Sequence, residues 1–137
     1  MKKLNVIVVY DEKEENILMC ERKKEPYKGK LNLVGGKLEE NETQEEAAYR
    51  ELEEETGITK QDICLKQIMD FQYALSGMEL EVFAGKLQKE KPLQEELNPL
   101  IWVDKHTNFF DLDKFAGEGN IGHMVWQVEL YKDKIFS

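Results

Sequence analysis

Residues 35–58 read Gly-Gly-Lys-Leu-Glu-Glu-Asn-Glu-Thr-Gln-Glu-Glu-Ala-Ala-Tyr-Arg-Glu-Leu-Glu-Glu-Glu-Thr-Gly-Ile, and the rest of the chain is organised around this stretch. The pattern predicts a glycine loop that runs into a helix. Thr43 and Glu46 have the spacing of a capping box, in which a hydroxyl and a carboxylate three residues later satisfy the first backbone N–H groups. Gly57 stands where a left-handed residue would end the helix. We therefore expect a helix between Thr43 and Gly57.

Three carboxylates of this helix are expected on one face. At about 100° per residue, Glu51, Glu54 and Glu55 fall within an arc of roughly 100°. Like charges at this spacing oppose a helix by about 0.2–0.5 kcal/mol each, and the last turn carries the negative end of the helix dipole. A bound Mg²⁺ or Mn²⁺ would remove the conflict, because these ions prefer carboxylate oxygens. An acidic helix face exposed to solvent is the alternative interpretation.

The stretch resembles the Nudix box, whose pattern is Gly, five residues, Glu, seven residues, and then Arg-Glu-apolar-x-Glu-Glu-x-Gly-apolar. Every fixed position of that pattern is filled here, by Gly36, Glu42, Arg50, Glu51, Leu52, Glu54, Glu55, Gly57 and Ile58. The resemblance implies a single Nudix hydrolase domain over residues 1–137. Its fold class would be α/β, a Nudix-type α/β/α sandwich with a mixed β-sheet between helices.

The composition suits one soluble globular domain, since the 137 residues are 34% charged and 41% hydrophobic. A net charge of −9 argues against a nucleic acid polymer as the main partner, although metal ions can still bring a nucleotide to an acidic protein. Cys20 and Cys64 form no disulfide or zinc pattern. No apolar run approaches the ~20 residues of a membrane span. We expect a cytoplasmic protein that does not contact membranes.

Further strands are expected on both sides of the box. The β-branched residues of 4–10 predict a central strand, and 17–22 would complete a hairpin with it. Residues 63–76 and 78–87 predict two more strands joined by a tight turn. Residues 100–103 predict a short buried strand.

The C-terminal part predicts a second helix, with Asn120 as its N-cap. Apolar residues at i, i+3, i+4 and i+7 would form its packing stripe; they are Ile121, Met124, Val125 and Val128. Of the aromatic side chains in the preceding strands, we expect Phe71, Tyr73 and Phe83 in the core rather than against a nucleotide base.

The resemblance also implies a metal site and a catalytic group. The metal ligands would be Gly35 (through its carbonyl), Glu51, Glu54, Glu55 and Glu96. Glu96 stands six residues before Trp102, as expected of a ligand from outside the helix, and Glu95 is the fallback. The catalytic residues would be Glu51, Glu54, Arg50 and Glu96. One of the glutamates would be the general base, and the sequence does not choose among them. Arg50 would pair with Glu42 or Glu51 and orient the carboxylates.

The substrate-binding candidates lie mostly before the box. In proteins that resemble this one, a basic residue at the end of the second strand contacts substrate phosphate, and Arg22 and Lys23 stand there. A solvated strand-end cation is the alternative. Lys37 would also face phosphate. Asn32 would present an amide to the base edge, with Asn120 as a helper; a turn-forming asparagine is the alternative for Asn32.

The implied activity is metal-dependent hydrolysis of a nucleoside diphosphate linked to another moiety. The Gly-Gly-Lys run and Asn32 resemble the branch that sanitises oxidised nucleotides, so 8-oxo-dGTP is the leading substrate. ADP-ribose and dinucleoside polyphosphates are alternatives. A catalytically silent Nudix-fold sensor is a third, although such proteins typically lose box carboxylates and this chain keeps them all. The partner would be a small-molecule nucleotide, and a homodimer is left open because many proteins of the family are dimers.

Overall fold

A computed structural model describes residues 2–137 and confirms the expected mixed sheet between helices. In chain order the elements are β1 (Lys2–Tyr10), β2 (Asn16–Glu21), β3 (Leu31–Asn32), β4 (Val34–Lys37), α1 (Gln44–Thr56), β5 (Lys66–Tyr73), β6 (Met78–Lys86), β7 (Leu100–Asp104) and α2 (Asn120–Ile135).

Strand β1 is the centre of the sheet, as its β-branched sequence predicted. It pairs in parallel with β6 along its whole length, and antiparallel with β4 over Leu4–Ile7 and with β2 at Tyr10. Strand β5 continues the sheet beyond β6, while β2 also pairs with β3 and β7. Both predicted hairpins, β1–β2 and β5–β6, are confirmed.

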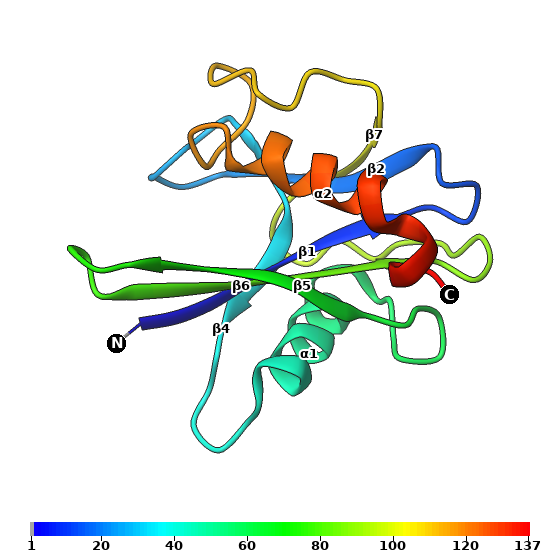
Figure 1. Ribbon diagram of the computed structural model, residues 1–137, viewed down its shortest axis with the longest axis horizontal. Coiled ribbons are helices and arrows are strands. Elements are labelled where there is room, and N and C mark those ends of the chain that lie inside the picture. Colours follow the sequence, from blue (N-terminus) through cyan, green and yellow to red (C-terminus); the bar gives the residue numbers. More distant parts are fainter. Residues whose placement is uncertain (1) are drawn as a thin grey trace.

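The sheet separates two apolar cores because alternate residues of a strand point to opposite faces. Ile7 and Val9 of β1 are buried on the face covered by α1. Val8 and Tyr10 are buried on the other face, with α2. Figure 1 shows the result, with α1 and α2 on opposite sides of the strands. Among residues 2–137, neither helix is long and apolar enough to cross a membrane.

Helix α1 has both of the ends that its sequence predicted. The Thr43 hydroxyl accepts the Glu46 N–H at 3.1 Å, and the Glu46 carboxylate accepts the Thr43 N–H at 2.8 Å. Gly57 adopts the left-handed conformation (φ 83°) and donates to the Glu53 carbonyl at 2.9 Å. No basic residue lies in the last turn, so no helix side chain there offsets the negative end of the dipole.

The expected glycine loop is wrong, because Gly35 and Gly36 lie within β4 and pair with β1. A Cβ atom at Gly35 would be 2.2 Å from the Asn5 carbonyl oxygen, and one at Gly36 would be 2.3 Å from the Glu51 carboxyl carbon. Real Cβ atoms do not approach so closely. Glycine is therefore needed at position 35, where the obstacle is the backbone of β1, whereas a side chain at position 36 would force the Glu51 carboxylate to move.

The predicted N-cap of α2 is also wrong. The cap position is Gly119, with φ 92° and no side-chain cap hydrogen bond, and Asn120 is the first helical residue. A left-handed cap favours glycine, and Asn120 instead turns its amide to the Tyr73 hydroxyl at 2.9 Å. The predicted apolar stripe of α2 is confirmed as buried, as are Phe83 and, in part, Phe71.

Candidate active site

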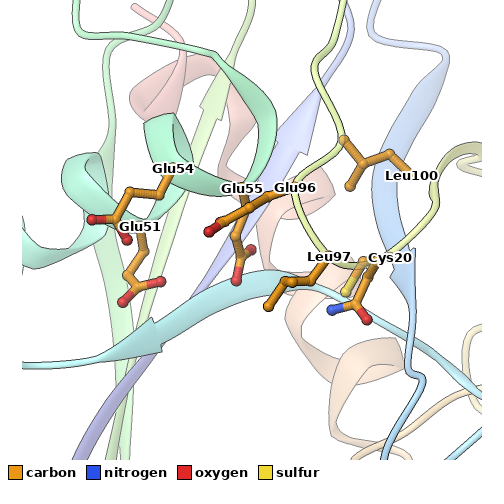
Figure 2. Close-up of a pocket in the computed structure, with 8 residues that line it drawn as sticks. Cys20, Glu51, Glu54, Glu55, Glu96, Leu97 and Leu100 are labelled. Atoms are coloured by element: carbon orange, nitrogen blue, oxygen red, sulfur yellow. The ribbon is translucent and has the colours of Figure 1, made fainter.

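The predicted carboxylates gather around one cavity of about 240 Å³ at the C-terminal half of α1. Glu51, Glu54 and Glu55 come from the helix, and Glu96 comes from the loop before β7 (Figure 2). The remaining lining residues are Cys20, Leu97, Asn98 and Leu100. The fallback, Glu95, is not among them, because its carboxylate accepts the Leu100 backbone N–H at 2.9 Å. The structure thus brings Glu96, rather than Glu95, to the acidic face of the helix.

Glu55 is the most buried carboxyl of the cluster. Burial raises its pKa to about 7; the Gly35 N–H, which donates to it at 3.2 Å, acts in the opposite direction. The charges of Glu51, Glu96 and Glu54 raise the pKa further. Glu55 therefore lies where a negative charge is costly unless a cation is present.

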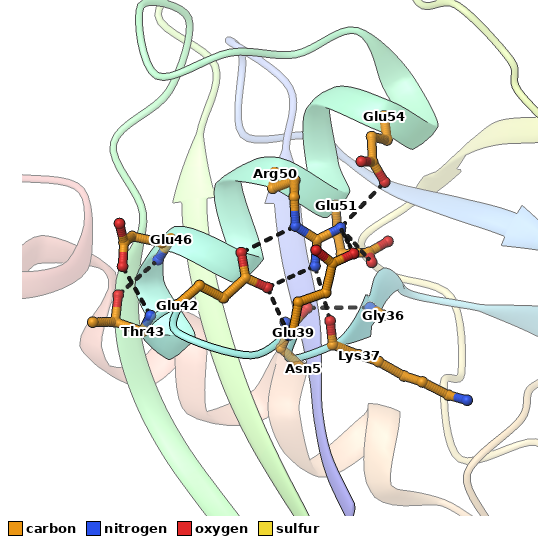
Figure 3. A network of polar contacts seen from close by, with 10 residues as sticks. All are labelled: Asn5, Gly36, Lys37, Glu39, Glu42, Thr43, Glu46, Arg50, Glu51 and Glu54. Carbon is orange, nitrogen blue, oxygen red and sulfur yellow. Dashed lines mark hydrogen bonds and ion pairs between the residues drawn. The ribbon is translucent and has the colours of Figure 1, made fainter.

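Arg50 hydrogen-bonds to two carboxylates of the cluster, Glu51 and Glu54 (Figure 3). Its guanidinium donates two hydrogen bonds, of 2.7 and 3.1 Å, to the carboxylate of Glu42. It also donates to Glu51 at 3.0 Å and to Glu54 at 3.3 Å. It also donates to the Lys37 carbonyl at 2.9 Å. These bonds hold the pKa of Glu42 below its usual range. Arg50 was predicted to pair with Glu42 or Glu51, and in the structure it pairs with both.

Gly36 leaves space for Glu51, because the Glu51 carboxylate occupies the volume that a side chain at position 36 would need. The Gly36 N–H donates to the side-chain oxygen of Asn5 at 3.2 Å, which holds this part of β4 in place. Burial raises the pKa of Glu51. Asn5 was not singled out from the sequence, because its partner lies 31 residues away.

The donor set fits a hard divalent cation such as Mg²⁺ or Mn²⁺, which prefers carboxylate oxygens. Within residues 2–137 no salt bridge reaches Glu55 or Glu96, whereas Arg50 partly neutralises Glu51 and Glu54. Among those same residues, no three Asp, Glu, His or Cys side chains lie close enough together to hold a metal ion as they are. A cation would therefore have to draw the carboxylates together. The Gly35 carbonyl as a ligand stays a prediction.

A second cavity, of about 560 Å³, lies on the α2 face of the sheet. We call it the nucleotide cavity, after the ligand that several of its lining residues are predicted to bind. Four of the five predicted substrate-binding residues line it: Arg22, Asn32, Lys37 and Asn120. The structure does not bring Lys23 there, because Lys23 is exposed and hydrogen-bonds to Glu21.

Hydrogen bonds hold both asparagine amides in this cavity, and at Asn32 the backbone N–H of Leu33 also fixes which way the amide faces. The Asn32 side-chain oxygen accepts the Leu33 N–H at 2.8 Å, which leaves its NH₂ group for a ligand. The Asn120 NH₂ group donates to Tyr73 at 2.9 Å, which leaves its oxygen for a ligand. One wall residue therefore offers a donor and another offers an acceptor.

Part of this cavity is not predicted by the sequence. Tyr73, expected in the core, lines the wall instead, because its hydroxyl reaches Asn120. Tyr27 and Glu118 also line it, and the Tyr27 hydroxyl donates to Glu118 at 2.6 Å. An aromatic residue within the polar loop after β2 was the available signal for Tyr27; nothing local marked Glu118.

The two cavities adjoin across β2, β3 and β4. Cys20 lines the acidic cavity and is the direct strand partner of Asn32, which lines the nucleotide cavity. The Lys37 carbonyl binds Arg50, while its side chain lines the nucleotide cavity and leads away from the network in Figure 3. Neighbouring residues of β2, β3 and β4 thus line the two cavities.

Comparisons with known proteins agree with this geometry. The family model described as NUDIX domain matches residues 1–118. An 8-oxo-dGTP diphosphatase of Escherichia coli K12 is 31% identical over 105 residues, which cover 75% of this chain and 81% of that protein. An ADP-ribose pyrophosphatase of Methanocaldococcus jannaschii is 51% identical over 47 residues, 34% of this chain and 28% of that one. A crystal structure of a Caenorhabditis elegans Ap4A hydrolase has the same fold, with a TM-score of 0.76 at 16% identity, covering 98% of this chain and 100% of that chain.

Proposed function

The chain belongs to the Nudix family of pyrophosphohydrolases, and on that basis we propose that it hydrolyses an oxidised purine nucleoside triphosphate of the 8-oxo-dGTP type. The products would be the nucleoside monophosphate and pyrophosphate. The observation that carries this proposal is the adjacency of an acidic cavity to a larger one lined by cations, tyrosines and oriented amides. The name of the Escherichia coli relative supports it.

A bound Mg²⁺ or Mn²⁺ would neutralise phosphate charge and lower the pKa of the attacking water. The side chains that would hold it are Glu51, Glu54, Glu55 and Glu96, together with the Gly35 carbonyl. A glutamate of this set would take the proton from the attacking water. Arg50 would keep Glu51 and Glu54 oriented through the hydrogen bonds already present. Lys37 and Arg22, both in the wall of the nucleotide cavity, would bind phosphate oxygens.

The oriented amides support an 8-oxopurine over an ordinary purine. Oxidation of guanine at C8 adds a carbonyl oxygen there and a proton at N7, so an acceptor at N7 becomes a donor. The free oxygen of Asn120 would accept from that N7–H, and the free NH₂ group of Asn32 would donate to a base carbonyl. Ordinary guanine would place its N7 lone pair against the Asn120 oxygen. A site of this kind rejects the unmatched base because its own polar atoms stay unpaired.

The test is the ratio of kcat/KM for 8-oxo-dGTP to that for dGTP with Mg²⁺, in wild type, Asn32→Ala and Asn120→Ala. Wild type should prefer the oxidised nucleotide. Each substitution should reduce the preference by about 1–3 kcal/mol, roughly 5- to 150-fold, the cost of an unpaired polar group. A wild-type ratio near unity would refute the substrate assignment. ADP-ribose and a dinucleoside polyphosphate belong in the same panel, and a much higher kcat/KM for either would replace it.

The cytoplasmic location and a single domain over residues 1–137 stay predictions, and a homodimer stays open. We propose the cytoplasmic location together with the activity, since a free nucleotide is a cytoplasmic small molecule. Binding of nucleotide without turnover would instead support the sensor alternative, for which the complete set of box carboxylates offers no support.

A further inference from the structure

A carboxylate lies in the wall of the nucleotide cavity among cations and amides. Of the described residues that line this cavity, Glu118 is the one with an acidic side chain. It stands in the turn directly before α2, two residues from Asn120. A carboxylate in this position does not help to bind phosphate, because both are negative. Its place beside the amides points to the base instead.

The turn and one hydrogen bond hold Glu118 in position. Its backbone is left-handed (φ 52°), between Gly117 (φ 83°) and Gly119 (φ 92°), which is unusual for a residue with a side chain. The Tyr27 hydroxyl donates to its Oε1 at 2.6 Å from the loop after β2. Hydrogen bonding to Glu118 raises the pKa of Tyr27 to about 12, so Tyr27 keeps its proton and remains the donor. The Glu118 carboxylate therefore has a fixed partner on one side.

The other side of the carboxylate remains available. A carboxylate has two oxygens, each able to accept two hydrogen bonds. Tyr27 uses one site on Oε1, and no donor among residues 2–137 hydrogen-bonds to Oε2. A ligand in the cavity can thus meet a negatively charged acceptor that is already oriented.

Guanine and adenine differ at the edge that such an acceptor recognises. Guanine, oxidised or not, carries two adjacent donors, N1–H and the 2-amino group. Adenine carries a lone pair at N1, which a carboxylate repels. We infer that Glu118 selects guanine-type bases by accepting hydrogen bonds from N1–H and the 2-amino group, and that Tyr27 is the positioning residue that holds its carboxylate. This inference rests on the proposed function, which places the base in this cavity; Asn32 and Asn120 would read oxidation, and Glu118 would read base type.

The test compares 8-oxo-dGMP with 8-oxo-dAMP by calorimetric titration, and the two triphosphates by kcat/KM. The guanine-to-adenine ratio is the readout, because removing a negative charge strengthens phosphate binding for both nucleotides alike. Glu118→Gln should lower the ratio by about 10- to 100-fold, the range of a charge-assisted hydrogen bond. Tyr27→Phe should lower it by about 3- to 10-fold with an unchanged Tm, since the carboxylate stays but loses its orientation.

Glu25→Gln is the control, because Glu25 is an exposed carboxylate of the loop after β2, which also carries Tyr27, and does not line the cavity. It should leave the ratio unchanged. An equal change for both bases in Glu118→Gln, or a wild type that binds neither monophosphate or prefers adenine, would overturn the inference. The preference for 8-oxo-dGTP over dGTP tests the proposed function separately. A protein that prefers guanine but ignores oxidation would refute the proposed substrate and leave the role of Glu118 standing.

Discussion

Replacing Glu55 by glutamine should change how the stability of the metal-free protein depends on pH. Glu55 is half-buried, and burial together with the nearby Glu51, Glu96 and Glu54 places its pKa at about 7, against the usual 4.5. A carboxyl whose pKa is raised by folding stabilises the folded state while it holds its proton. That contribution is complete below pH 4.5 and is lost as the pH rises through 7. The difference between the two pKa values corresponds to about 3 kcal/mol.

Glutamine keeps the shape of the side chain and an oxygen for the Gly35 N–H, but it carries no charge. Urea unfolding in the presence of a chelator, followed by tryptophan fluorescence, measures the free energy of unfolding. Relative to wild type, Glu55→Gln should become more stable by about 2–3 kcal/mol as the pH rises from near 5 to near 8. Saturating Mg²⁺ near pH 8 should stabilise wild type and have much less effect on the variant, because the ion would bind the ionised cluster.

The control is Glu53→Gln, an exposed carboxylate on the same helix that does not line the acidic cavity. Its stability relative to wild type should not vary with pH over this range. If the difference between Glu55→Gln and wild type is equally pH-independent, Glu55 is not the strained anion that the structure indicates, and the argument for a cation at this site loses its energetic support.

Three further outcomes follow from the same geometry. Glu96→Gln should reduce Mg²⁺-dependent turnover at least about 10-fold more than Glu95→Gln; equal, small effects would return the loop to a structural role. Gly36→Ala should leave a folded protein with impaired turnover, because the Cβ of the alanine would displace the Glu51 carboxylate. Full activity would show that turnover does not depend on this position of Glu51. Arg50→Lys should lower the free energy of unfolding by about 1–3 kcal/mol and reduce kcat, since lysine cannot make paired hydrogen bonds; urea unfolding and steady-state kinetics would detect both effects, and unchanged values would contradict the network.

Local patterns were sufficient for the helix that carries the carboxylates. The capping box and the left-handed glycine of α1 depend on residues within a few positions of each other, so both ends were predicted correctly. The run of β-branched residues likewise predicted β1 and its place in the centre of the sheet. Glu96 could be proposed only from the spacing to Trp102 in similar proteins, because its loop has no pattern of its own.

Contacts between distant segments explain the errors. The sequence predicts a loop at Gly35 and Gly36 because what requires glycine there comes from β1 and α1, which lie far away along the chain. Tyr27 hydrogen-bonds across 91 residues to Glu118, and Tyr73 reaches Asn120 across 47. A cavity wall assembled in this way leaves no periodic signal in the sequence, so the base-reading side of the site could be predicted only in part.

The most direct test of the account is the identity of the products formed from 8-oxo-dGTP with Mg²⁺, resolved by anion-exchange chromatography for wild type and Glu54→Gln. We predict 8-oxo-dGMP and pyrophosphate in equal amounts from wild type, no turnover in excess chelator, and a loss of several orders of magnitude in kcat for the folded Glu54→Gln variant. Release of single phosphate, undiminished turnover in chelator, or an active Glu54→Gln variant would contradict a metal-dependent pyrophosphohydrolase built on this acidic cluster.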